Sequence, residues 1–257
     1  MLYNDNKSMS IQYGKIMKRT YLTILLLLCS LQISFAKQPP LKIAAAYFVP
    51  PYTMIAGNQQ KFGFDIDMIR ILCKSMKREC IFQSMPFGEL IPTLKNNKAD
   101  LAVGAIAITL PRSKEINFSK PYLPSSAAFI MHTGSKKKTP YNSIIGVEKD
   151  TIFRYELLQM GMKEENIKVY SDENIMIDAL SDHDVDMVFI DTPVAKYWDR
   201  KSSGDLKIYG QPSPYAYGLG IGINPKNAKL IKDIDKALNQ YLNSQDFQSN
   251  YEIYFGN

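Results

Sequence analysis

The chain has 257 residues, of which 46% are apolar and 22% are charged, and its formal net charge is +6. This composition is typical of globular proteins and excludes the disordered and fibrous classes, and the length suits one large domain or two small ones. Residues 1–36 hold four basic residues and one acidic residue, so the remainder carries only about +3. A charge this small does not indicate binding to nucleic acid.

Residues 17–36, "MKRTYLTILLLLCSLQISFA", have the three parts of a secretory signal. A basic pair precedes an apolar run of about 11 residues, and small residues lead up to Ala36. A membrane anchor is the alternative, but a spanning helix needs about 20 apolar residues. We therefore expect export and removal of residues 1–36. The polar residues before Met17 fit either a long leader or a start of translation at Met17.

Two cysteines, Cys73 and Cys80, remain after the leader. An even number of cysteines in an exported chain favours a disulfide that closes a short loop, and two small core residues are the alternative. The only histidines, His132 and His183, are far apart in the sequence and have no cysteine partners. This pattern argues against a zinc site or a histidine-based triad, and no cofactor motif is present.

Predicted strands and helices alternate along the chain. The first series begins with a strand at 41–48, and the order restarts near residue 143. This order predicts an α/β fold with largely parallel sheets. The first series comprises strands at 41–48, 79–85 and 100–108 and helices at 65–76 and 88–97; the second comprises strands at 143–150, 167–171 and 184–191 and helices at 153–162 and 173–182.

The two series have a similar construction, because "ELIPTLKNNKADLAVGAI" and "NIMIDALSDHDVDMVFID" both run from a helix through a polar turn and Asp into an apolar strand. We therefore expect two lobes. A crossing strand at 120–131 and a Gly-rich strand at 217–224 would connect them as a two-strand hinge. The predicted boundaries are 37–126 with 217–257 for the first lobe and 127–216 for the second, and a capped helix at 224–242 completes the first lobe.

Two charged residues follow the similar strands. Arg112 comes after "AIAITLP" at the start of a short helix, and Asp191 ends "DMVFID". Ligands of open α/β sheets bind beyond the carboxyl ends of the strands, so we expect both side chains to face one cleft. A guanidinium binds a carboxylate and a carboxylate accepts from an ammonium, which together suit an α-amino acid. Taken singly, Arg112 would be a solvated helix residue and Asp191 a helix cap.

The segments "VPPYTM", "GFDIDM", "FGELIPTLKNNKADLAVGAIAIT", the following Arg112 and "INFSKPY" resemble, in order and spacing, the polar amino-acid-binding proteins of ABC importers, solute-binding protein family 3. The resemblance covers about residues 41–257. It implies the two-lobe fold of type II periplasmic binding proteins and a monomer that captures a free amino acid in the periplasm. The ligand would then pass to an inner-membrane permease. "CKSMKREC" also resembles the short disulfide loop of the histidine, lysine, arginine and ornithine binders.

The resemblance also assigns roles to single residues. Arg112 matches the arginine that holds the ligand α-carboxylate, and Asp191 matches the aspartate that binds the α-ammonium. Phe87 matches an aromatic residue that packs on the ligand side chain, although an ordinary core residue is an equal alternative. Thr151 matches a hydroxyl residue near the carboxylate. Ala105 and Ala107 fall where the family offers backbone N–H groups, and the hydroxyl usual at position 107 is absent.

Other positions bear on which amino acid is bound. Ala46 and Val49 stand where relatives have an acidic residue and a stacking aromatic residue. We expect Tyr47, Phe48 or Tyr52 to compensate, unless Tyr52 is a core residue. Glu148 falls at a position that faces the ligand side chain in relatives, and it is either an attractor of a cationic side chain or a solvated strand residue. Glu148 and the cysteine loop favour a basic amino acid, whereas Ala46 does not.

The leading interpretation is a binding protein that catalyses no reaction. The same family includes cyclohexadienyl dehydratases, which act on prephenate or arogenate, and Glu148 would then be the general acid. A third interpretation is a ligand-binding partner of a sensor. The sequence does not distinguish a sensor partner from a transport protein.

Overall fold

The structure is a computed structural model that describes residues 38–136 and 139–256. The predicted signal peptide, residues 1–36, lies outside these ranges. Within them, no helix combines the length and the apolar character that a membrane span requires. The description below concerns the body that starts at Pro39.

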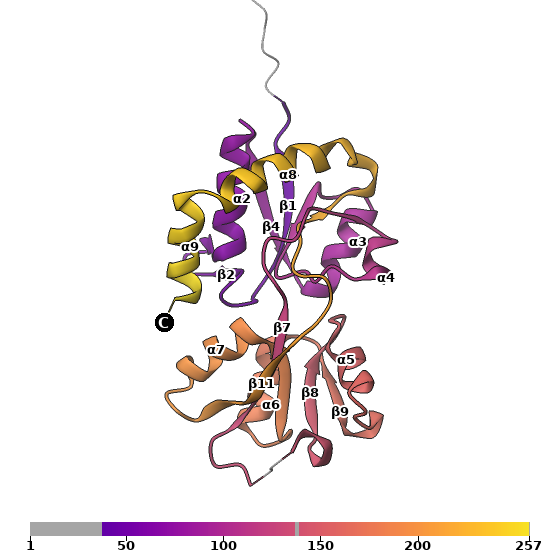
Figure 1. Ribbon diagram of the computed structural model, residues 1–257, viewed down its shortest axis with the longest axis vertical. Coiled ribbons are helices and arrows are strands. Elements are labelled where there is room, and N and C mark those ends of the chain that lie inside the picture. Colours follow the sequence, from indigo (N-terminus) through magenta and orange to yellow (C-terminus); the bar gives the residue numbers. More distant parts are fainter. Residues whose placement is uncertain (1–37, 137–138, 257) are drawn as a thin grey trace, which may run out of the picture. The chain divides into compact units, whose positions relative to one another are not determined.

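The first of two five-stranded sheets defines the part that we call lobe 1, and its strand order is β4-β1-β5-β12-β6 (Figure 1). β1 pairs in parallel with β4 and β5, whereas β12 runs antiparallel to β5 and β6. The strands are β1 (Leu41–Ala46), β4 (Cys80–Met85), β5 (Leu101–Val103), β6 (Asn117–Phe118) and β12 (Gly222–Ile223). The helices that accompany them are α2 (Phe64–Ser75), α3 (Leu90–Lys95), α4 (Leu110–Ser113), α8 (Lys229–Leu242) and α9 (Gln245–Phe255), and a hairpin joins β2 (Met54–Ile55) to β3 (Lys61–Phe62).

The second sheet defines lobe 2, and its strand order is β11-β7-β10-β8-β9. β8 pairs in parallel with β10 and β9, whereas β7 runs antiparallel to β10 and β11. The strands are β7 (Ser126–His132), β8 (Ile145–Glu148), β9 (Ile167–Tyr170), β10 (Met187–Asp191) and β11 (Leu206–Pro214). The helices are α5 (Phe153–Gln159), α6 (Glu173–Ser181) and α7 (Thr192–Lys201).

The predicted two-lobe α/β fold is confirmed, but the sheets are mixed rather than largely parallel. In each sheet, strands that enter from or return to the other lobe run against their neighbours: β12 in the first sheet, and β7 and β11 in the second. The sequence analysis did not identify β11 or α9. The strand positions support the predicted lobe boundaries near residues 126 and 217, which stay a prediction.

Two chain segments cross between the lobes and are hydrogen-bonded to each other. Tyr122 N–H donates to the Leu219 carbonyl at 2.9 Å, and Leu219 N–H donates to the Leu123 carbonyl at 2.9 Å. Tyr215 N–H donates to the Ser125 carbonyl at 3.3 Å. This short antiparallel ladder is the two-strand connection that the sequence predicts.

The helix α2 shows how the sequence builds the core of lobe 1. Phe64, Met68 and Leu72 recur every four residues, so they share one face of the helix, and all three are fully buried. The helix packs against α8 and α9. The Phe64 ring lies 4.9 Å from the Phe255 ring of α9 and 6.2 Å from the Tyr122 ring, centroid to centroid. The C-terminal helix therefore closes this core.

Cys73 at the end of α2 and Cys80 at the start of β4 form a disulfide. The disulfide prediction is thus confirmed, and the alternative of two unpaired core residues is wrong. The bridge ties the turn between the helix and the strand at the amino-terminal edge of the sheet.

The apolar run at 100–108 is not one strand. β5 ends at Val103, and Gly104 (φ 140°) and Ala105 (φ 53°) have positive φ values that no continuing strand adopts. Thr109 then caps α4 by accepting from the Arg112 N–H at 3.3 Å, and Pro111 lies in the first turn. The helix start at 109–112 is therefore confirmed, whereas the predicted strand is five residues too long at its carboxyl end.

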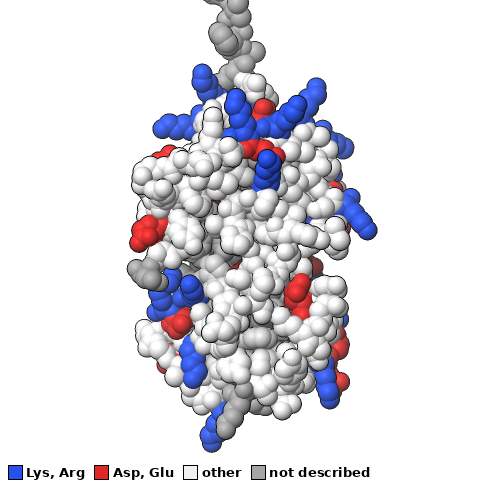
Figure 2. Space-filling model, viewed as in Figure 1, with Lys and Arg blue, Asp and Glu red and all other residues white. Residues whose placement is uncertain are grey.

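Positive charge gathers at one end of lobe 1 in the view of Figure 2. Exposed lysines at the amino-terminal edge of the first sheet include Lys42 at the start of β1, Lys74 at the end of α2 and Lys98 before β5. Because the strands β1, β4 and β5 are parallel, this edge is opposite to the one at which Gly104 to Arg112 lie.

Candidate functional site

A cavity between the lobes is lined by residues from both. Its volume is about 20 Å³, which is room for about one water molecule. A groove of about 700 Å³ adjoins it and shares Arg112, Thr151 and Ile152 with it. The cavity residues are Val49, Phe87, Gly104, Ala105, Ala107 and Arg112 from lobe 1 and Glu148, Thr151, Ile152, Phe153, Glu173, Ile190, Asp191 and Val194 from lobe 2, with Tyr215 from the crossing segment.

Arg112 joins the two lobes directly. Its Nη1 donates to the Ala107 carbonyl at 3.1 Å, and its Nη2 donates to the Asp150 carbonyl of lobe 2 at 3.1 Å. The guanidinium carbon lies 5.4 Å from the centre of the Phe87 ring, within cation–π range. Burial lowers the pKa of Arg112, while the charges of Tyr215, Asp191 and Asp150 act in the opposite direction. The contacts hold a cation with a fixed orientation at the cavity wall.

Asp191 ends the central strand β10 and is 6% exposed. Its Oδ1 accepts a hydrogen bond from the Tyr215 hydroxyl. Burial raises the pKa of Asp191 to about 7, against the lowering effects of the Tyr215 hydrogen bond and of Arg112. A bound ammonium group would supply the opposite charge that this carboxylate needs.

The loop after β5 is held by a buried carboxylate of α2. Asp65 Oδ2 accepts from the N–H groups of Gly104 and Ala105, each at 2.9 Å, and from the Tyr122 hydroxyl at 2.9 Å. The Ala105 N–H is therefore already bound and is not the free donor that the resemblance implied. By contrast, the Ala107 N–H has no acceptor among the described residues.

The turn after β8 brings lobe 2 against lobe 1. Thr151 Oγ1 donates to the Glu148 carbonyl at 2.6 Å and accepts from the Phe153 N–H at 3.4 Å, so its hydroxyl shapes the start of α5. A methyl group at Gly88 would lie 2.3 Å from Asp150 Oδ2. Gly88 thus allows a close approach of the two lobes beside the cavity.

Two glutamates of lobe 2 also line the cavity. Burial raises the pKa of Glu148 to about 8, and the charges of Asp172, Asp191 and Asp150 add to this effect. Glu173 is 2% exposed, and burial raises its pKa well above the usual value; the Trp198 hydrogen bond opposes this and the charge of Glu148 adds to it. Glu148, the last residue of β8, is only partly exposed and lines the cavity, so it is not a fully solvated strand residue.

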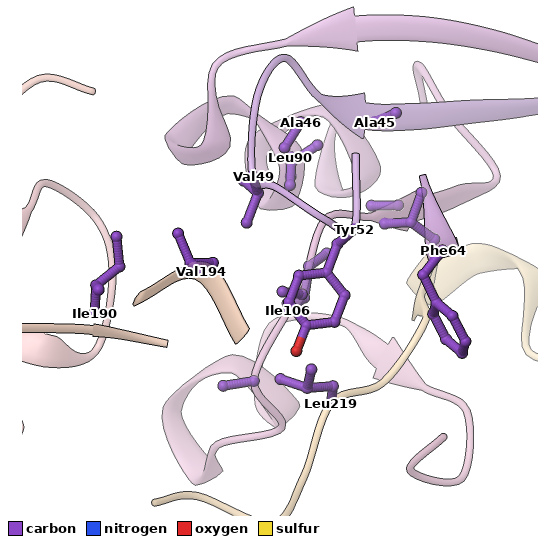
Figure 3. Packing of buried hydrophobic residues seen from close by; sticks show 14 of the residues in the cluster. Ala45, Ala46, Val49, Tyr52, Phe64, Leu90, Ile106, Ile190, Val194 and Leu219 are labelled. Atoms are coloured by element: carbon purple, nitrogen blue, oxygen red, sulfur yellow. The ribbon is translucent and has the colours of Figure 1, made fainter. Parts of the chain in front are cut away.

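The remaining wall is apolar. Figure 3 shows Val49 on the side of lobe 1 that faces Ile190 and Val194 of lobe 2. Tyr52 does not line this cavity. It is 1% exposed, it packs 5.4 Å from the Phe255 ring, and in Figure 3 it lies beside Ile106 and Leu219. The alternative that Tyr52 is a core residue is confirmed, and its expected contact with the ligand is wrong.

The structure brings together Arg112, Asp191, Phe87, Thr151, Ala105, Ala107 and Glu148, and it adds Glu173 and Tyr215, which the sequence analysis did not identify. In the sequence, Glu173 looks like an ordinary acidic residue in the first turn of a helix. Tyr215 directly follows β11, a strand that the sequence analysis did not identify. No group of three or more potential metal ligands occurs in the described part of the chain.

Comparisons with known proteins agree with this geometry. Residues 41–257 match the bacterial extracellular solute-binding proteins, family 3. The arginine-binding periplasmic protein of Mannheimia haemolytica is 34% identical over 93% of this chain and 99% of its own length. ABC transporter arginine-binding protein 1 of Escherichia coli K12 is 32% identical over 86% of this chain and 92% of its own length.

A solved structure is also similar. The periplasmic binding protein of an arginine transport system from Legionella pneumophila is 30% identical, has a TM-score of 0.78, and aligns over 85% of this chain and 100% of its own. The chain thus belongs to the bacterial extracellular solute-binding proteins, family 3.

Proposed function

We propose that this protein is the periplasmic binding component of an ABC importer and that it captures a cationic amino acid, arginine in the first place. The observation that carries the proposal is the lining of one buried cavity by Arg112, Asp191 and Glu148. These three charges complement the carboxylate, the ammonium group and a cationic side chain of one ligand.

Each proposed contact has a physical basis. Arg112 binds the α-carboxylate through its guanidinium, and the unpaired Ala107 N–H donates to the same group. Asp191 accepts from the α-ammonium. Glu148 attracts the side-chain cation, and Phe87 packs on the aliphatic part of the ligand. Thr151 and Ala105 shape the wall through their own hydrogen bonds.

Ligand entry requires a conformational change, because the cavity of about 20 Å³ is far too small for an amino acid. We propose that the lobes separate about the crossing segments near residues 126 and 217 and close on the ligand. The adjoining groove, which shares Arg112 with the cavity, is the entry path.

The names of the relatives support the ligand class and the cellular role. Proteins from Mannheimia haemolytica and Escherichia coli K12 are named as arginine-binding, and one of them as part of an ABC transporter. By extension, this protein is exported, acts as a monomer without a cofactor or a catalysed reaction, and delivers its ligand to an inner-membrane permease.

A thermal-shift panel tests the proposal. The protein is unfolded and refolded to remove bound ligand and is then tested with the twenty amino acids, ornithine, citrulline, prephenate and arogenate. A ligand at a hundred times its dissociation constant stabilises the fold by about 2.7 kcal/mol, so the melting temperature rises by several degrees. We expect the largest response to arginine. Silence to every amino acid together with release of phenylpyruvate from prephenate would instead identify a dehydratase.

A further inference from the structure

Glu173 is a buried acid for which the proposed contacts give no role. It is the first residue of α6, directly after the helix cap Asp172, and its side chain is 2% exposed. It nevertheless lines the cavity between the lobes. A carboxylate is rarely buried without a partner, because its desolvation is costly.

Glu173 has a hydrogen-bond partner in the helix α7. Trp198 of α7 donates its indole N–H to Glu173 Oε1 at 2.6 Å, which fixes the direction of the carboxylate. The Trp198 ring lies 6.2 Å from the ring of Phe48, which belongs to lobe 1. The group that orients Glu173 therefore takes part in the contact between the lobes.

Glu173 and Glu148 belong to the same electrostatic cluster. Both line the cavity, and the charge of each lies close enough to that of Asp191 to be affected by it. In the described residues the Glu148 carboxylate has no hydrogen-bond donor. Lobe 1 contributes no acidic side chain to the cavity lining. Ala46 stands where the resemblance led us to expect an acidic residue, and Val49 stands where it led us to expect an aromatic one.

We propose that Glu173, oriented by Trp198, is a specificity-determining residue that binds the cationic end of the ligand side chain together with Glu148. This inference rests on the proposed function. Trp198 is the positioning residue, and Val49, Ile190 and Val194 enclose the aliphatic part of the ligand side chain.

Two carboxylates suit a guanidinium better than an ammonium group. A guanidinium is planar and has five N–H donors in a fixed fork, so it can donate to two carboxylates at once, whereas an ammonium is a compact point charge. Charge balance favours a ligand with a cationic side chain, arginine and lysine alike. The cavity holds one guanidinium and three carboxyl groups, and an arginine ligand brings two positive charges and one negative charge.

The test compares arginine with citrulline, its uncharged isostere, by titration calorimetry. Glu173→Gln keeps the size of the side chain and removes its charge. We expect this variant to bind arginine about a hundredfold more weakly and to bind citrulline as well as the unaltered protein does, since only the charged ligand loses its partner. Trp198→Phe keeps a ring against Phe48 but removes the N–H donor, so the arginine-to-citrulline affinity ratio should fall about tenfold.

Glu165→Gln is the matched control, because the Glu165 side chain is 75% exposed and is not among the residues that line the cavity. It should leave both affinities unchanged. An unchanged arginine-to-citrulline affinity ratio in Glu173→Gln would overturn the role of Glu173. If that variant does not fold, an unchanged ratio in Trp198→Phe would do the same. In either case, arginine binding by the unaltered protein would leave the proposed function standing. Failure of the unaltered protein to bind arginine would overturn both.

Discussion

Arg112 is placed by short-range features of its own segment. Thr109 and Pro111 start α4, and the guanidinium turns back to the Ala107 carbonyl five residues earlier. The position of this cation at the end of an apolar strand could therefore be predicted from the sequence. Its contact with Asp150 could not, because that contact depends on how the lobes close.

Arg112→Ala should weaken ligand binding more than a hundredfold. The substitution leaves the ligand carboxylate and Asp191 without their buried cation, and the loss of one member of a buried charge pair costs about 3–5 kcal/mol. Calorimetric titration with arginine measures the effect. Arg154→Ala is the control, because Arg154 pairs with Glu164 at a side-chain exposure of 50% and lies outside the cavity lining. Near-normal affinity in Arg112→Ala would refute the assignment.

Other residues of the site show the limits of local patterns. In the sequence, Glu148 and Glu173 resemble any exposed acidic residue. Only the fold shows that Glu173 is buried and that Glu148 is partly buried at the cavity wall. Tyr52 shows the opposite error. Its place in the segment "VPPYTM" suggested a ligand contact, but its ring is buried in the core against Phe255 of α9. The sequence analysis did not identify that helix.

At the scale of elements, the alternation of apolar runs predicted most of the strands and helices, and the errors occur where distant groups decide the backbone. The run at 100–108 bends after Val103 because Asp65, some forty residues earlier, binds the N–H groups of Gly104 and Ala105. β11 was not predicted, since most of its side chains after Leu206 are at least partly exposed and its pattern is polar. Periodicity alone contains no sign of either feature.

The link between α2 and the loop after β5 can be tested with Asp65→Asn. Two backbone N–H groups and a tyrosine hydroxyl all donate to Oδ2, whereas the buried Oδ1 has no hydrogen-bond partner among the described residues. Asn keeps one acceptor oxygen for these donors, but it removes the negative charge and places an NH₂ group where there is no acceptor. We expect the free energy of unfolding to fall by about 2 kcal/mol. Arginine affinity should fall as well, because the loop lines the cavity. Denaturant unfolding and calorimetry of the same sample measure both, and a loss of stability alone would mean that the loop keeps its shape without Asp65.

The disulfide should affect stability without affecting binding. It closes a short loop between α2 and β4, at the opposite edge of the sheet from the cavity. A loop of this length stabilises the fold by about 2.5 kcal/mol through the unfolded state. Replacement of Cys73 and Cys80 by alanine together should therefore lower the denaturation midpoint and leave the arginine dissociation constant within about twofold. A large change in affinity would show that the two edges of the sheet are coupled.

For the whole molecule, the decisive feature is that neither lobe alone forms the site. Lobe 1 provides the cation and the aromatic ring, and lobe 2 provides the three carboxyl groups. The similarity between the two halves of the sequence predicted this division, because it implied that Arg112 and Asp191 end equivalent strands. With Arg112 against Glu148, Glu173 and Asp191, the cavity lining is net acidic, which suits a cationic ligand.

The burial of these carboxyl groups predicts how the stability of the whole protein depends on pH. Burial raises the pKa of Asp191 to about 7 and of Glu148 to about 8, whereas unfolded carboxyl groups titrate near 4. Between these limits the folded protein holds more protons than the unfolded chain, so the free energy of unfolding falls as the pH rises. The ligand-free protein should therefore melt at a higher temperature at pH 5 than at pH 8. Asp65, with a pKa raised by burial to about 6, contributes in the same direction.

Arginine should reverse part of this dependence. Its two cationic groups favour the ionised forms of Asp191 and Glu148, so its affinity should increase from pH 6 to pH 8 and its binding should release protons at neutral pH. Calorimetry in two buffers with different ionisation enthalpies measures the number of protons released. Glu148→Gln removes one titrating group, and both the proton release and the fall in melting temperature with pH should become smaller. Equal proton release in the variant and the unaltered protein would show that Glu148 does not respond to the ligand charge, and the contact between Glu148 and the ligand side chain would have to be abandoned.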